Sequence, residues 1–185
     1  MQTIESKQNG IDTTALRASM KAIAQKPGEG KVRFHVCTEW SGGTQSTTRV
    51  EDWQIGDKTQ GRSFTILADE PPELLGNSIA PNPQELLMAG LNACLTVGYV
   101  TGCSMRGIEV DSLEIETEGD LDLRGFLGLD PNVKPGYDEL RYTVRIRSSG
   151  TKEQIQQIHD TVMATSPNFF NLANPIRLKP TLVVE

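Results

Sequence analysis

This 185-residue sequence lacks several features that would mark a familiar class of protein. It has no dense cluster of lysine and arginine, and its formal net charge is -6 with a pI near 5.0. Because binding to phosphate backbones needs a basic patch, no nucleic-acid partner is expected. The polar stretch 1–10 has no apolar core of the kind that export signals carry, and no internal repeat is visible.

Long apolar runs and paired cysteines are also missing. The longest apolar run, within residues 86–100, is interrupted by Asn92 and Thr96, and we expect it to be too short to span a bilayer. The three cysteines are odd in number and have no paired spacing, which favours a reducing compartment over a disulfide scaffold. We therefore expect a cytoplasmic protein without a membrane partner.

Metal-binding and hydrolytic signatures are scarce as well. The two histidines, His35 and His159, have no cysteine, histidine or carboxylate at metal-ligand spacing, so no metal site is predicted. No phosphate-binding glycine loop and no serine–histidine–aspartate pattern stands out, and no cofactor is expected.

Three segments have helical spacing of apolar residues or helix-capping signals. Residues 13–25 form a short amphipathic pattern that ends at Pro27-Gly28. The segment 83–106 starts with Asn82 as N-cap and Glu85 closing a capping box, and Gly107 ends it. The segment 151–165 begins with a capping box of Thr151 and Gln154.

Alternating apolar and polar residues predict strands between these helices. In residues 31–37, Val32, Phe34 and Val36 share one face, which predicts a half-buried strand. Further strands are expected at 47–53, 62–68, 112–118, 139–147 and 177–184. Strands grouped between helices indicate an α+β fold with mostly antiparallel sheet.

The segment 83–106 is apolar nearly all round, which is typical of a buried helix. Small residues recur every four positions along it, at Gly90, Cys94, Gly98 and Gly102. Each internal glycine costs about 1 kcal/mol relative to alanine. Close approach of another backbone would compensate for that cost, so we expect a helix–helix contact along this stripe.

Cys94 lies within the stripe, and two interpretations are open. A free cysteine is often a small, inert, buried hydrophobe, but it can also be a reactive thiol. Cys103 lies about 180° around the helix and roughly 13 Å along it. A disulfide needs Cα atoms within about 7 Å, so these two cysteines cannot pair within one helix.

Several runs together resemble the OsmC-like and organic hydroperoxide resistance families. They are ADEPP at 68–72, PNPQELLMAGLNACL at 81–95, GDLDLRGFLGL at 119–129 and SPNFF at 166–170, followed by Asn174-Pro175. The similarity covers roughly residues 30–185, which predicts one OsmC-like domain there and a polar segment with a short helix at 1–29.

The resemblance implies an intertwined homodimer in which long central helices are flanked by curved, mostly antiparallel sheets. It also implies a thiol peroxidase, in which a cysteine thiolate attacks a small organic hydroperoxide and becomes a sulfenic acid that a second cysteine resolves. Cys94 occupies the position of the attacking cysteine. The expected catalytic positions are Cys94, Arg49, Gln84 and Ser166.

The departures from the family pattern leave alternatives open. The resolving cysteine is replaced by Ser166, so Cys103, Cys37 or an outside thiol reductant protein would have to resolve an oxidised Cys94. The glutamate that positions an arginine is replaced by Gln84. That arginine is Arg49 or Arg62, and without such a cation an apolar site would hold little thiolate at neutral pH.

The alternative function is a catalytically degenerate dimer that holds a small apolar ligand or has a structural role. Residues 119–137 form a glycine-rich loop with the apolar residues Phe126, Leu127 and Leu129, which we expect to be exposed. Such a loop favours subunit packing over substrate contact.

Overall fold

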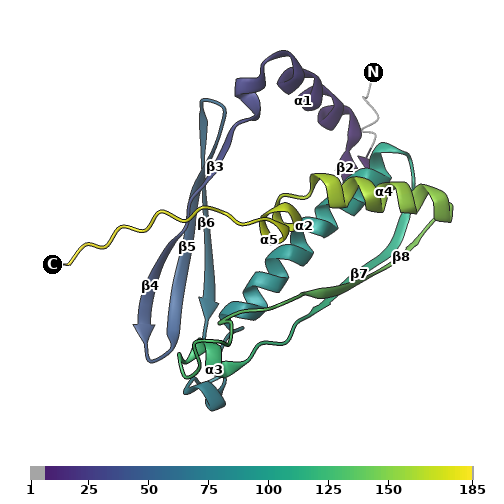
Figure 1. Ribbon diagram of the computed structural model, residues 1–185. Helices are drawn as coiled ribbons and strands as arrows, with labels where there is room; N and C mark the ends of the chain where they lie inside the picture. The colour runs from purple at the N-terminus through teal and green to yellow at the C-terminus, as the bar shows by residue number, and fades with distance from the viewer. Residues whose placement is uncertain (1–6, 185) are drawn as a thin grey trace. The chain divides into compact units, whose positions relative to one another are not determined.

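The computed structural model describes residues 7–184 (Figure 1). The chain divides into two units, Met1–Ala89 and Gly90–Glu185, and each is taken by itself. Helix α2 (Pro83–Met105) starts in the first unit and continues through the second.

The first unit consists of a short hairpin, a helix and a four-stranded antiparallel sheet. Strand β5 pairs with β6 along one edge and with β3 and β4 along the other, so it is the central strand of the sheet. The elements in order are β1 (Lys7–Gln8), β2 (Ile11–Asp12), α1 (Thr13–Gln25), η1 (Pro27–Gly30), β3 (Val32–Phe34), β4 (Cys37–Gly42), β5 (Gln45–Ile55), β6 (Lys58–Ala68) and η2 (Pro72–Leu74).

Helix α1 has the predicted bounds, and Asp12 caps it by accepting a hydrogen bond from the backbone N–H of Ala15. The predicted strand 31–37 is divided between β3 and β4. The prediction that its apolar face is half-buried is wrong within this unit, because Phe34 is 68% exposed and Val32 and Val36 are exposed too. A sheet buries one face only when a second layer packs on it.

The buried carboxylate of Asp69 organises the loop that leads into α2. Its side chain accepts hydrogen bonds from the Thr44 hydroxyl at 2.6 Å and from three backbone N–H groups, those of Glu70, Asn77 and Ile79. The residue is 1% exposed. The bond from Thr44, with the backbone bonds after it, lowers the pKa of Asp69 from its ordinary value.

The predicted capping box follows this loop. The Asn82 side chain accepts from the backbone N–H of Glu85 at 2.9 Å, and the Glu85 carboxylate accepts from the backbone N–H of Asn82 at 2.8 Å. The backbone N–H groups of Asn82 and Glu85 at the start of α2 are therefore both hydrogen-bonded, as the sequence predicted.

The second unit places a two-stranded antiparallel sheet and two further main helical segments beside α2 (Figure 1). Its elements are β7 (Val110–Glu118), α3 (Leu123–Phe126), β8 (Arg141–Ser148), α4 (Lys152–Thr165) and α5 (Pro167–Ala173). The capping box of Thr151 and Gln154 is present, and Gly107 after α2 has a φ of 70°, which suits glycine.

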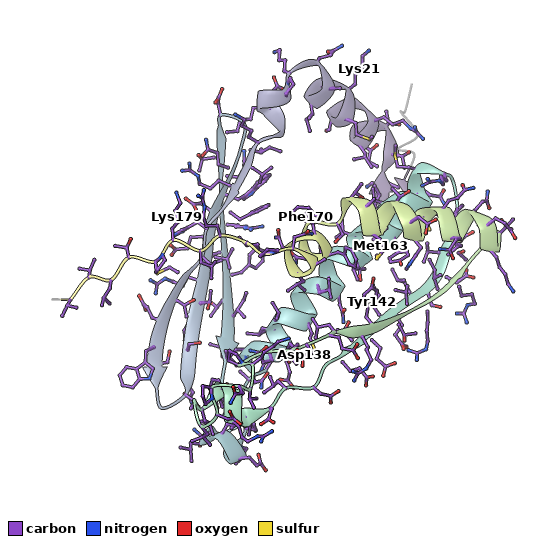
Figure 2. All side chains as sticks on the ribbon, in the orientation of Figure 1. Lys21, Asp138, Tyr142, Met163, Phe170 and Lys179 are labelled. Atoms are coloured by element: carbon purple, nitrogen blue, oxygen red, sulfur yellow. The ribbon has the colours of Figure 1, made fainter. Side chains whose placement is uncertain are left out.

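The core of this unit lies between α2, α4 and the inner face of the sheet. The fully buried apolar residues are Leu91, Leu95, Tyr99, Cys103, Ile108, Ile158 and Val162. Alternate residues of the sheet pack against them, including Leu113, Ile115, Val144 and Ile146, as the alternation predicted. Figure 2 shows Tyr142 of β8 below Met163 of α4, where its hydroxyl donates to the Met163 sulfur at 2.7 Å.

Two predictions for the second unit were wrong or incomplete. The expected strand at 177–184 does not form, and Leu178, Leu182, Val183 and Val184 are exposed. A strand needs a paired edge for its backbone N–H and C=O groups, and no described strand pairs with this segment. Helix α5 was missed, although Ser166 at its N-cap and Pro167 at its first position are standard start signals.

By length and composition alone, α2 is long and apolar enough to cross a membrane: it has 23 residues, and an 18-residue stretch of it has a mean hydropathy of 1.5. The prediction that its apolar run is too short for a span therefore does not hold for the helix as a whole. The core helix of a soluble protein meets the same criterion, and α2 supplies four of the buried residues above.

The environment of Asp69 gives a pH-dependent prediction. Because the folded pKa is depressed, the stabilisation is fully present above the unfolded value of about 3.9 and is lost as the pH falls through the folded pKa. Asp69→Asn should lower the urea midpoint at neutral pH, and the difference from the native protein should narrow below about pH 4. A constant difference at all pH values would contradict this role.

Candidate functional site

The small-residue stripe of α2 faces α4 and α5. A Cβ built on Gly98 would lie 3.0 Å from Val162, and one built on Gly102 would lie 3.0 Å from Ile158. The predicted helix–helix contact is therefore confirmed. Side chains of α4 pack against the small residues of the stripe, whereas the sequence predicted that the backbone of another helix would contact them.

Farther along the stripe, the side-chain amide of Asn168 in α5 donates to the Gly90 carbonyl at 2.8 Å. A Cβ on Gly90 would lie 3.7 Å from that amide nitrogen, in ordinary contact. Polar and apolar contacts together thus fix α5 against α2 on the side where Cys94 lies.

Cys94 occupies the middle of this stripe and is half-buried. Its Sγ lies 3.3 Å from the Oγ of Ser166, which connects α4 to α5 and is 5% exposed. The backbone N–H of Phe169 donates to the same Ser166 oxygen at 3.3 Å. That donor occupies an oxygen lone pair, so the hydroxyl proton of Ser166 is available to the Cys94 sulfur.

Either group can donate in this contact, and in both cases the contact orients the Cys94 sulfur toward Ser166. The pair can therefore hold a nucleophilic sulfur in one orientation. Ser166 is the one hydrogen-bond partner of the Cys94 side chain within the described residues. No arginine or lysine is in hydrogen-bond contact with that sulfur in this part of the chain.

The other predicted positions belong to the first unit. Arg49 on β5 makes a two-pronged ion pair with Glu39, with N–O distances of 2.9 Å and 2.7 Å, and its Nε lies 3.7 Å from Glu51. The hydrogen bond to Glu39 raises the pKa of Arg49, and the same bond lowers the pKa of Glu39. Arg49 is thus already neutralised by carboxylates of its own sheet.

Arg62 on β6 lies with its guanidinium 5.7 Å from the ring centre of Phe64, within cation–π range. Gln84 is half-buried in the first turn of α2, roughly 15 Å along that helix from Cys94. Of the predicted site residues, the structure brings Cys94 and Ser166 together. A role for Arg49, Arg62 or Gln84 at Cys94 stays a prediction.

The remaining cysteines differ sharply from Cys94. Cys103 is fully buried in the core, and burial raises the pKa of its thiol, so it is a poor nucleophile. Cys37 on β4 is exposed and is paired in register with Arg49. All three cysteines are free.

Sequence reasoning missed one polar pair in the core of the second unit. The hydroxyl of Tyr99, on α2, lies 2.5 Å from Nδ1 of His159, on α4. Nothing in the sequence marks this pair, because the two residues are 60 positions apart and follow no spacing rule. Within the described residues, no group of three histidine, cysteine or carboxylate side chains could hold a metal ion.

The sequence model of the OsmC-like protein family matches residues 76–181, more than half of the chain. The chain belongs to the OsmC-like family. The matched range contains α2, the β7–β8 sheet, α4 and α5, and therefore both Cys94 and Ser166.

Solved structures of OsmC-like proteins share this fold at low sequence identity. The OsmC-like protein of Mycoplasma pneumoniae matches with a TM-score of 0.60 and 16% identity, over 77% of this chain and 89% of that one. An OsmC-like protein of unknown function from Vibrio cholerae matches with a TM-score of 0.53 and 15% identity, over 74% and 91%. A search of curated proteins gave no match.

Proposed function

We propose that this OsmC-like protein is a thiol-dependent peroxidase that reduces organic hydroperoxides through Cys94. The observation that supports it most directly is the contact between the Cys94 sulfur and the buried hydroxyl of Ser166. A half-buried thiol held against a buried hydroxyl is accessible and oriented, as nucleophilic attack requires, whereas the thiol of Cys103 is fully buried.

In the first step, the Cys94 thiolate attacks the terminal oxygen of a hydroperoxide ROOH. The O–O bond breaks, an S–O bond forms, and the leaving alkoxide takes up a proton to become the alcohol ROH. Sulfur is oxidised to the sulfenic acid, and the peroxide is reduced. The Ser166 hydroxyl, 3.3 Å from the sulfur before reaction, can then donate to the new oxygen.

The second step needs a thiol from outside the chain. Ser166 stands beside the sulfur but cannot form a disulfide, and Cys103 is sealed in the core on the opposite face of the helix. In this proposal an external thiol attacks the sulfenic acid, giving a mixed disulfide and water. A second thiol then releases Cys94 as the thiolate and leaves with the first as a disulfide.

We also propose that the working form is a homodimer. One face of the sheet of the first unit exposes large apolar side chains, among them Val32 at 45% and Phe34 at 68%. Exposed apolar side chains gathered in this way mark protein–protein contacts. Gln84 cannot contact Cys94 of its own chain, because the two residues lie far apart along the same helix. In a dimer, Gln84 or Arg49 of the second copy could reach Cys94.

The rival is a degenerate dimer that has kept the fold and lost the chemistry. Two replacements favour it: serine at 166 and glutamine at 84. Both functions predict the same assembly, so the reaction of Cys94 decides between them.

Oxidation by cumene hydroperoxide at neutral pH should convert Cys94 to a sulfenic acid that dimedone traps and mass spectrometry locates. Ser166→Ala should slow this step about tenfold, since hydrogen bonds to charged groups contribute about 1.5–3 kcal/mol. Cys94→Ser should abolish trapping at this site, and Cys37→Ser should leave it unchanged. If Cys94 reacts no faster than the exposed Cys37, the peroxidase proposal is wrong and the degenerate dimer stands.

Light scattering after gel filtration should give a mass near twice 20.3 kDa at micromolar concentration. Val32→Glu with Phe34→Glu should shift the protein toward the monomer, because burying two unpaired carboxylates in an apolar interface is costly. Lys21→Glu, an exposed change on α1, is the control. A monomeric native protein would refute the dimer.

A further inference from the structure

A cavity open to solvent lies in the second unit, on a different side of α2 from Cys94. It measures about 590 Å³ and is lined by residues of β8 and α4, with Tyr99 of α2 also lining it. Tyr99 lies five positions after Cys94, and this spacing places the two side chains about 140° apart around the helix. This cavity is therefore not part of the Cys94 site. Its volume is in the range of pockets that take small molecules.

The inner part of the cavity is apolar. Val144 and Ile146 come from the inward face of β8, and Ile155 comes from the facing side of α4. All three are half-buried and pack against the core. A compact hydrocarbon group placed here would lose contact with water on several sides, which favours its binding.

The rim of the cavity is basic. Arg147 at the end of β8 and Lys152 in the first turn of α4 both line it, and the described lining residues include no carboxylate. Arg147 is held only loosely by Asp111, with an N–O distance of 3.7 Å and a side chain that is 74% exposed. The nearby Asp160 carboxylate accepts a hydrogen bond from the Gln156 side chain, itself part of the lining. The amino-terminal end of α4 adds positive potential at this rim.

His159 adds a polar ring of fixed orientation. Its Nδ1 is bonded to the hydroxyl of Tyr99, which is 1% exposed. Burial raises the pKa of Tyr99 to about 12, so the phenol keeps its proton at neutral pH and can donate to Nδ1. Nε2 is then the ring nitrogen of His159 that is left to contact a molecule in the cavity.

We propose that this cavity binds a small organic carboxylate, with the carboxylate at Arg147, Lys152 and His159 and the hydrocarbon part against Val144, Ile146 and Ile155. The two cations meet the negative charge beside the His159 ring, and the apolar inner wall selects against purely inorganic anions. The proposal does not depend on the chemistry of Cys94.

Hexanoate is a suitable probe, and amide chemical shifts followed by NMR report its binding. It should shift the resonances of Ile146, Ile155 and His159 with a dissociation constant on the order of millimolar, as suits a small ligand. Hexan-1-ol, which lacks the charge, and acetate, which lacks the chain, should each bind at least about tenfold more weakly, a difference of 1.4 kcal/mol.

The double variant Arg147→Gln, Lys152→Gln should weaken hexanoate binding about tenfold, because two exposed charge pairs are lost. Arg145→Gln is the matched control, since Arg145 does not line the cavity and is engaged by Glu114 and Glu116. Cys94→Ser should bind hexanoate like the native protein, which separates this site from the peroxidase proposal. Equal binding of hexanoate and hexan-1-ol, or binding untouched by the double variant, would overturn the proposal.

Discussion

The close approach of α2 to α4, which only small residues on α2 permit, fixes the groups that could perform chemistry in the second unit. Gly102 faces Ile158 and Gly98 faces Val162, and a methyl group at either glycine would come within 3.0 Å of the opposing side chain. One further step of four residues brings Cys94 opposite Ser166. The glycines cost about 1 kcal/mol each in helix propensity, and the packing of two buried β-branched side chains offsets this cost.

The same contact explains why the two polar sites stay separate. The small face of α2 directs Cys94 toward the junction of α4 and α5, while a different face places Tyr99 beside His159. Leu91, Leu95 and the core residues around them fill the space between. Each site is therefore built on helices held by packing, so its polar groups have defined partners and do not depend on flexible loops.

Local signals in the sequence predicted the helices well. The bounds of α1 and both capping boxes follow from rules that act within a few residues, and the inward face of β8 follows from its alternation. The errors concern partners that local rules do not specify. Val32 to Val36 needed a covering layer, and residues 177–184 needed a neighbouring strand.

The candidate site was predictable only in part. The four-residue spacing on α2 placed Cys94 at a helix contact, and the family resemblance pointed to position 166. The pairing of Tyr99 with His159 and the cavity beside it depend on a tertiary arrangement of residues 60 positions apart, which no sequence pattern encoded.

The register between α2 and the α4–α5 junction can be tested directly by Ser166→Cys. A mild oxidant such as diamide should convert this variant to a form with one disulfide within a single chain, and peptide mapping should identify it as the bond between residues 94 and 166. The native side-chain contact of 3.3 Å is close enough for this bond with a small adjustment. If the introduced thiol stays free, or bonds with Cys37 or Cys103 instead, the packing of α2 described here is wrong.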